Sequence, residues 1–313
     1  MKIIKIISII TTLLLSSHTI AQWQPKGPIK FQVGFGAGGV TDTLGRIIAT
    51  SIEKDTGWDV VVENKPGGGG VAMFSRLSAT KADGQTIGLG VNLPILINLA
   101  LRGEKLPFKA DSFDYLGTIA QVPLAIVASK DAPFNTFKEL VDYSEEKGGV
   151  LISFDAKPQE MVIRAVNKNH NAKLRLLSQK SDAEALQSVL GGHAAASFVA
   201  GAHIKYIESG QLKLIAAATS QRHEYSPQTA TLREQGFDFA LEPTIYVAAP
   251  KGLPADVKAA LVAALDKALT SPDVIKLVQS SIYTAPNNLG AQKTLEKMVM
   301  GLDDIKSLTS LAQ

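Results

Sequence analysis

The sequence of 313 residues contains no cysteine, which excludes disulfide scaffolds, thiolate metal sites and cysteine nucleophiles. It also has little excess charge, because 32 basic residues against 29 acidic ones leave a net charge of only +3. A chain so close to neutral has no broad basic field for a phosphate backbone, and this argues against a nucleic-acid partner. Aromatic residues are sparse at 6%, but hydrophobic residues reach 45%, enough for two ordinary globular domains.

The sequence has no apolar run long enough to span a bilayer, which takes roughly 20 residues. The run Ile6–Leu15 follows the basic residues Lys2 and Lys5 and precedes small residues that end at Ala21. This layout is typical of a secretory signal, so we expect residues 1–21 to be a cleaved signal peptide. Export without disulfides favours the periplasm of a Gram-negative bacterium, where the mature chain would carry a net charge of +1.

Patterns for metal binding and catalysis are missing as well. The histidines after the signal are His170, His193, His203 and His223, and no two of them have H-x-x-x-H spacing. No G-x-S-x-G elbow is present to carry a serine nucleophile. The sequence therefore predicts no metal, no cofactor and no catalytic residue, and indicates that the protein is not an enzyme.

Short β-branched runs alternate with helical patterns along most of the chain. Ile29–Phe35 and Asp59–Glu63 read as strands, and between them Leu44, Ile48 and Ile52 mark one face of a helix. Repeated strand, turn and helix predict right-handed βαβ units and a parallel sheet.

The βα pattern continues from Leu124 to Ala218, whereas the region from Pro254 to Leu308 is purely helical. These closing helices have no sheet of their own, so we expect them to cover the first sheet. The prediction is an α/β protein of two lobes, each a mostly parallel sheet flanked by helices, with a ligand cleft between them. The predicted limits are residues 22–122 and 244–313 for lobe 1, and 123–243 for lobe 2, which is inserted.

Two glycine-rich turns follow successive strands of the first predicted sheet. Gly34–Gly39 fits the G-x-G-x-x-G dinucleotide pattern, but the match is weak, and Val40-Thr41 replaces the Lys-Ser/Thr that a P-loop needs. Both this turn and Pro66–Gly70 lead into helix N-termini, which attract small anions through free N–H groups and the helix dipole. Because both turns lie at the carboxyl edge of one sheet, we expect them to converge on one ligand.

Neutral donors are expected where ligand charge is met without buried cations. Capping alone would explain Thr41 and Asp42, and turn formation would explain Asn64 and Asn92. The ligand-binding candidates in lobe 1 are Phe35, Gly36, Ala37, Gly38, Gly39, Thr41, Asp42, Asn64, Gly67, Gly68, Gly69 and Asn92.

Five segments together resemble the Bug family, or TctC type, of tripartite tricarboxylate transporter solute-binding proteins. They are Phe35–Asp42, Val60–Gly70, Ala82–Thr86, Pro227–Glu234 and Val247–Pro254. The resemblance spans essentially the whole mature chain. It implies a type II periplasmic binding protein fold that closes on a small carboxylate, with one carboxylate held by the loop Gly36–Asp42 and the Asn64–Gly70 loop beside it.

Lobe 2 departs from the family pattern. A Gly/Ser-rich turn is replaced by Asp155–Glu160, a Pro-Tyr-Lys-Gly-like segment by Leu177–Ser181, and a common acidic residue by Ala195. The far end of the ligand is therefore set by different residues in this chain. The candidates in lobe 2 are Ser153, Asp155, Gln179 and Lys180, and Lys157 is a further cation that could meet a second carboxylate.

The resemblance implies a monomeric periplasmic protein that captures a small organic carboxylate, such as a di- or tricarboxylate. It also implies delivery of this ligand to the membrane permease subunits of a tripartite tricarboxylate transporter. A ligand sensor that signals to a two-component sensor kinase is the alternative.

Overall fold

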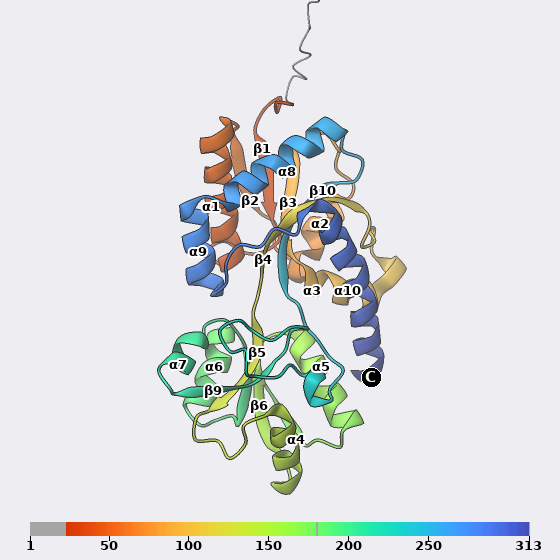
Figure 1. Ribbon diagram of the computed structural model, residues 1–313. Helices are drawn as coiled ribbons and strands as arrows, with labels where there is room; N and C mark the ends of the chain where they lie inside the picture. Colours follow the sequence, from red (N-terminus) through yellow and green to blue (C-terminus); the bar gives the residue numbers. More distant parts are fainter. Residues whose placement is uncertain (1–22, 180, 313) are drawn as a thin grey trace, which may run out of the picture.

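The structure, a computed structural model, describes residues 23–179 and 181–312. The expected signal peptide, residues 1–21, and the candidate Lys180 lie outside the described residues. Figure 1 shows two lobes, one above the other, joined by extended segments of chain.

The first sheet has five strands in the order β2-β1-β3-β10-β4. Four of its strands come from the N-terminal part of the chain, and one returns from far along the sequence. Its strands are β1 (Ile29–Val33), β2 (Val60–Asn64), β3 (Thr86–Val91), β4 (Phe113–Gln121) and β10 (Thr244–Pro250).

The second sheet also has five strands, in the order β7-β6-β8-β5-β9, and all of them lie between β4 and β10 in the sequence. Its strands are β5 (Leu124–Ser129), β6 (Val150–Phe154), β7 (Leu174–Ser178), β8 (Ala196–Ala200) and β9 (Leu212–Ala217). We therefore propose the lobe limits that the sequence suggested, 22–122 with 244–313, and 123–243.

Both sheets are mixed, although four of the five strands in each point the same way. β10 is antiparallel to β3 and β4, and β5 is antiparallel to β8 and β9. These are the two strands that enter a lobe from the other lobe. Because each starts at the edge of its sheet that faces the partner lobe, where Ile245 pairs with Val91 and Leu124 with Ala200, it must run against its neighbours.

Two elements of lobe 1 were not anticipated from the sequence, namely β4 and the helix α3. Pro94 is the third residue of α3, a position where its missing N–H is not needed. The helices of this lobe are α1 (Val40–Thr56), α2 (Val71–Leu77), α3 (Asn92–Arg102), α8 (Ala255–Leu269), α9 (Pro272–Ile282) and α10 (Gly290–Ala312), with short 3₁₀ turns at Gly68–Gly70 and Gly103–Lys105.

The sequence predicts helices over Thr136–Glu146, Glu160–Asn167 and Asp182–Leu190, and lobe 2 contains all three together with one short extra helix. Thr136 caps α4 by accepting a hydrogen bond from the Glu139 amide, as its position before an amphipathic run indicates. The helices are α4 (Phe137–Glu146), α5 (Lys157–Asn169), α6 (Asp182–Leu190) and α7 (Ile204–Glu208), followed by a 3₁₀ turn at Arg233–Gln235.

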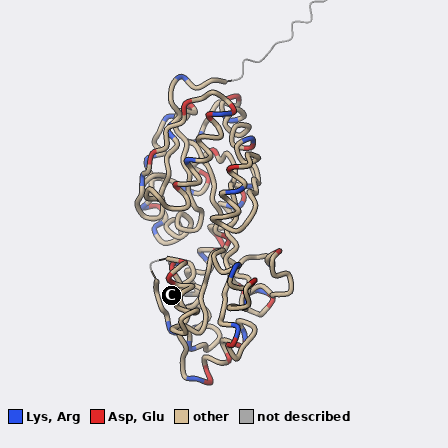
Figure 2. Tube along the Cα trace, turned by 90° about the vertical axis from the view of Figure 1, so that its left-hand side faces the viewer, with Lys and Arg blue, Asp and Glu red and all other residues tan. Residues whose placement is uncertain are grey.

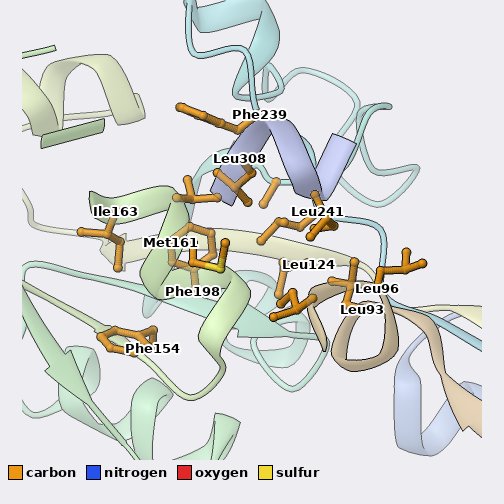
Figure 3. Close-up of a cluster of buried hydrophobic side chains, with 14 of the residues drawn as sticks. Leu93, Leu96, Leu124, Phe154, Met161, Ile163, Phe198, Phe239, Leu241 and Leu308 are labelled. Atoms are coloured by element: carbon orange, nitrogen blue, oxygen red, sulfur yellow. The ribbon is translucent and has the colours of Figure 1, made fainter. Parts of the chain in front are cut away.

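The last helix, α10, packs on both lobes. α8 and α9 contact α1 in lobe 1, as expected for a covering layer, but α10 contacts α3 and β4 in lobe 1 and also α5 in lobe 2. Figure 3 shows Leu308 of α10 in one apolar cluster with Leu96 of α3 and Met161 of α5. α10 therefore contacts the first sheet, as expected for a closing helix, and in addition reaches lobe 2.

The two segments that cross between the lobes lie side by side. The Val122 amide donates to the Pro243 carbonyl at 2.8 Å. Buried Asn92, at the start of α3, holds the returning segment by accepting from the Thr244 amide (2.8 Å) and donating to the Glu242 carbonyl (3.1 Å). A hinge between the lobes would lie at this paired crossing.

Basic and acidic residues are intermixed along the chain in both lobes, as Figure 2 shows. None of the helices within residues 23–179 and 181–312 combines the length and the apolar character that a bilayer crossing requires.

Candidate functional site

A cavity of about 430 Å³ lies between the lobes, beside the crossing segments. Its walls come from the carboxyl edges of both sheets and from the end of α9. The lining residues are Val40, Thr41, Val91, Leu93, Pro94, Val122, Leu124, Asp155, Ala156, Pro158, Gln159, Asp182, Ala200, Ala202, Pro243, Ile245, Ser281 and Ile282. Its volume suits a small organic molecule, because ligand pockets typically measure about 300–1,000 Å³.

The first residues of four helices lie in this wall. Thr41 belongs to the first turn of α1, Pro94 to that of α3, Pro158 to that of α5, and Asp182 to that of α6. The first N–H groups of a helix have no acceptor within the helix, and the helix dipole makes this end partially positive. The two ends in lobe 1 favour a ligand group that carries negative charge, whereas Asp155 and Asp182 offset the positive ends in lobe 2.

The first glycine loop is organised by Asp42, which is buried at the start of α1. Its Oδ2 accepts from the Gly38 amide (2.9 Å) and from Arg46 Nε (3.1 Å), and its Oδ1 accepts from Asn64 Nδ2 (2.8 Å). The hydrogen bonds from Arg46, Gly38 and Asn64 outweigh burial and lower the pKa of Asp42 to about 2. Asp42 therefore shapes the loop as a permanent anion, and we do not assign it a direct ligand contact.

Asn64 completes the same network from the end of β2. Its Nδ2 also donates to the Phe35 carbonyl (3.1 Å), and its Oδ1 accepts from Arg46 Nη2 (3.0 Å). Gly36 and Gly39, with Ala37 between them, are exposed, and Thr41 lines the cavity itself. The hydrogen bonds of Asp42 and Asn64 thus fix the loop whose exposed glycines lead to Thr41 in the cavity wall.

The two glycine loops touch through their backbones. A Cβ on Gly34 would lie 2.8 Å from the Gly70 Cα, and a Cβ on Gly69 would lie 2.4 Å from the Pro94 Cβ. Gly67, Gly68 and Gly69 all have positive φ, which favours glycine. Gly69 packs beside Pro94, and none of these three candidates lines the cavity.

The wall from lobe 2 carries two carboxylates, Asp155 after β6 and Asp182 at the start of α6. Burial raises the pKa of Asp182 to about 6, and the charge of Asp155 adds to this effect. Burial also raises the pKa of Asp155. Within the described residues neither forms an ion pair, and no Lys, Arg or His lines the cavity.

Several residues that the sequence suggested as ligand contacts instead form hydrogen bonds or ion pairs with other parts of the protein. Ser153 is fully buried in β6, and its hydroxyl donates to the Ala185 carbonyl (2.9 Å), so the ligand role is wrong for it. Asn92 is also wrong, because both ends of its amide bind the hinge segment. Gln179 donates to the Ser188 hydroxyl (2.9 Å), and Lys157 pairs with Glu160 at the surface (3.0 Å). Neither of these two lines the cavity.

Three residues of the site were missed from the sequence. Arg46 stands four residues after Asp42, the spacing at which helical side chains meet, and that signal was available. Asp182 was interpreted only as the start of a helix. Gln159 accepts from the Asp155 amide (3.0 Å) and the Ala156 amide (3.3 Å), and so caps the helix that follows.

A second, larger groove of about 1,130 Å³ lies between α9–α10 and lobe 2, and no glycine-loop residue lines it. His223 lines it, whereas His203 is fully buried and its Nε2 lies 2.7 Å from the Tyr225 hydroxyl. Among the described residues no group of His, Asp and Glu is arranged to hold a metal ion.

Known proteins resemble this chain along most of its length. Residues 44–300 match a family described as the tripartite tricarboxylate transporter family receptor. Protein BugT of Bordetella pertussis is 27% identical over 274 residues, covering 85% of this chain and 84% of that protein. A TctC solute binding protein from Polaromonas, solved without ligand, has a TM-score of 0.79 at 25% identity, over 91% of this chain and 99% of that one. An R. palustris protein with adipate shares the fold, with a TM-score of 0.71 at 20% identity over 92% and 98% of the two chains.

Proposed function

This chain belongs to the tripartite tricarboxylate transporter receptor family, of the Bug or TctC type, and we propose that it is a periplasmic solute-binding protein for a small organic carboxylate. Proteins of this family are transport receptors and not enzymes. The permease of a tripartite tricarboxylate transporter would receive the ligand, and the receptor would act as a monomer.

The observation that carries this proposal is the cavity between the lobes, whose lobe 1 wall contains the first turns of α1 and α3. Backbone amides at such helix ends can bind a carboxylate without any buried cation. The structural relative with adipate supports a carboxylate ligand, although its likeness to this chain concerns the fold.

Binding would proceed by closure of the lobes about the crossing segments at Val122 and Pro243. The ligand carboxylate first meets the amides of Gly36–Thr41, and lobe 2 then brings Asp155 and Asp182 against the other end. A ligand that contacts both lobes favours the closed state, because it binds that state more tightly than the open one. The closed receptor would dock on the permease.

The test uses the purified chain from residue 22 onward, with mono-, di- and tricarboxylates in a thermal-shift screen followed by calorimetry. We expect at least one carboxylate to raise the melting temperature and to bind with a one-to-one stoichiometry. Native mass spectrometry of the protein as purified would identify any ligand that co-purifies. If no carboxylate binds and the protein instead binds a ligand that has no carboxylate, the proposal is overturned.

A further inference from the structure

The two ends of the cavity differ in the carboxylates that they carry. Among the described residues, lobe 1 contributes the first turns of α1 and α3 and no carboxylate to the wall, whereas lobe 2 contributes the first turns of α5 and α6 together with the carboxylates of Asp155 and Asp182. Between these ends the wall is apolar, formed by side chains such as Leu93, Val122, Leu124, Ile245 and Ile282. The described wall of the cavity therefore has carboxylates at its lobe 2 end only and apolar side chains in its middle.

The carboxylates at the lobe 2 end are held in place by backbone and not by cations. Asp182 Oδ1 accepts from the Ala200 amide at 2.7 Å, and Gln159 fixes the turn that carries Asp155. Within the described residues, neither carboxylate has a basic partner that would cancel its charge. Two half-buried carboxylates side by side disfavour a second anion and favour a cation that neutralises both.

A ligand with carboxylates at both ends fits this cavity poorly. Its first carboxylate would find the helix ends, but its second would lie against Asp155 and Asp182, with like charges in a partly desolvated space. A ligand with an ammonium group at that end would instead donate N–H bonds to both side chains.

The lining also distinguishes among cations. No Trp, Tyr or Phe lines the cavity among the described residues, so no aromatic cage is present for a quaternary ammonium group. Carboxylate oxygens are suited to a cation with N–H groups, because each N–H can form a charge-assisted hydrogen bond.

We propose that the ligand is a zwitterion, with a carboxylate on the lobe 1 amides, an apolar spacer, and a protonated primary or secondary amine held between Asp155 and Asp182. This inference rests on the proposed function for its carboxylate end. It adds the substrate class, an amino acid whose two charged groups are separated, and it assigns specificity to the lobe 2 pair.

The test compares ligands of matched chain length by calorimetry at pH 7.5, using straight-chain ω-amino acids, the corresponding α,ω-dicarboxylates, monocarboxylates and N-trimethylated amino acids. We expect the best ω-amino acid to bind roughly ten- to hundredfold more tightly than its matched dicarboxylate. Trimethylation should remove that advantage. Equal or tighter binding of the dicarboxylate would overturn the inference.

Substitutions of the two aspartates test whether they cause the preference for an amine. The Asp155→Asn/Asp182→Asn double variant keeps the shape of both side chains, and we expect it to lose the preference for the amine while still binding the monocarboxylate. Asp142→Asn, at an exposed position paired with Lys138, is the matched control and should retain the preference. A double variant that kept the preference would contradict the assignment.

The competing assignment places Lys180 against a second ligand carboxylate, and Lys180→Gln tests it. Selective loss of dicarboxylate binding in Lys180→Gln would overturn the zwitterion inference. If monocarboxylates bind but an added amine contributes nothing, this inference fails alone. If no compound with a carboxylate binds, the proposed function fails with it.

Discussion

Asn64 Nδ2 lies 2.8 Å from Asp42 Oδ1, and this hydrogen bond joins the end of β2 to the first turn of α1. Asn64 also binds the Phe35 carbonyl, so one amide side chain holds both ends of the first glycine loop. Neither side chain needs to touch a ligand for the pair to decide how well the loop binds one.

Asn64→Ala removes this link, and we expect ligand affinity to fall roughly tenfold, because the loop amides lose their fixed arrangement. Calorimetry with the best carboxylate identified in the screen measures the change. Asn169→Ala is the matched control, since Asn169 only donates to the Ala165 carbonyl within α5. Unchanged affinity in Asn64→Ala would show that the network does not serve binding.

Gly36→Ala separates binding from folding. A Cβ on Gly36 meets nothing within 4 Å, and its φ is not positive, so the unliganded fold should keep its melting temperature. The added methyl group would stand where the carboxylate approaches the backbone, and we expect a loss of affinity of roughly tenfold or more. Gly27→Ala, equally free of contacts, should change neither quantity. Full affinity in Gly36→Ala would place the carboxylate elsewhere.

Asn92→Ala tests the assignment of Asn92 to the hinge. The substitution leaves the Thr244 amide and the Glu242 carbonyl without their partner, which should destabilise the protein by about 1–3 kcal/mol. Chemical denaturation measures this loss. Because the side chain does not line the cavity, the folded variant should retain affinity within a few-fold, and a large selective loss of affinity would restore the ligand role.

Asp182→Asn should stabilise the unliganded protein at pH 7. Burial raises the folded-state pKa of Asp182 to about 6, so the folded protein binds more protons than the unfolded chain between the two pKa values. Stability therefore falls as pH rises from about 4 to 6. Removing the charge should recover about 1–2 kcal/mol at pH 7, measured by denaturation against Asp142→Asn. A destabilised Asp182→Asn variant would contradict this.

His203 gives the opposite pH dependence. Burial, aided by the nearby His223, lowers the pKa of His203 to about 3, so the folded protein keeps it neutral while the unfolded chain protonates it below about pH 6.5. The free energy of unfolding is therefore unaffected by His203 protonation above pH 6.5. Below pH 6.5 it falls by about 1.4 kcal/mol for each pH unit. Between pH 6.5 and 5, His203→Gln should show a shallower loss than the wild type. The exposed His193→Gln variant should follow the wild type, and identical slopes in all three proteins would refute the assignment.

The candidate site was predicted in part. Sequence patterns placed Gly36–Thr41 and Asp155 at the ends of strands, and the structure puts Thr41 and Asp155 in the cavity wall. Polar side chains were harder to assign. Ser153 and Asn92 are possible ligand donors by residue type, but in the structure they form hydrogen bonds with backbone groups. Which partner a polar side chain finds depends on residues distant in the chain.

The sequence by itself determined the alternation of strands and helices, the glycine turns that lead into helix N-termini, and the family, because these depend on local periodicity and local motifs. Only the tertiary structure decided the antiparallel course of β5 and β10, the packing of α10 on both lobes, and the meeting of Asp155 with Asp182. Those features depend on contacts between segments far apart in the chain. The direction of a strand follows from where it enters the sheet, and the pKa of a carboxylate follows from the groups that surround it.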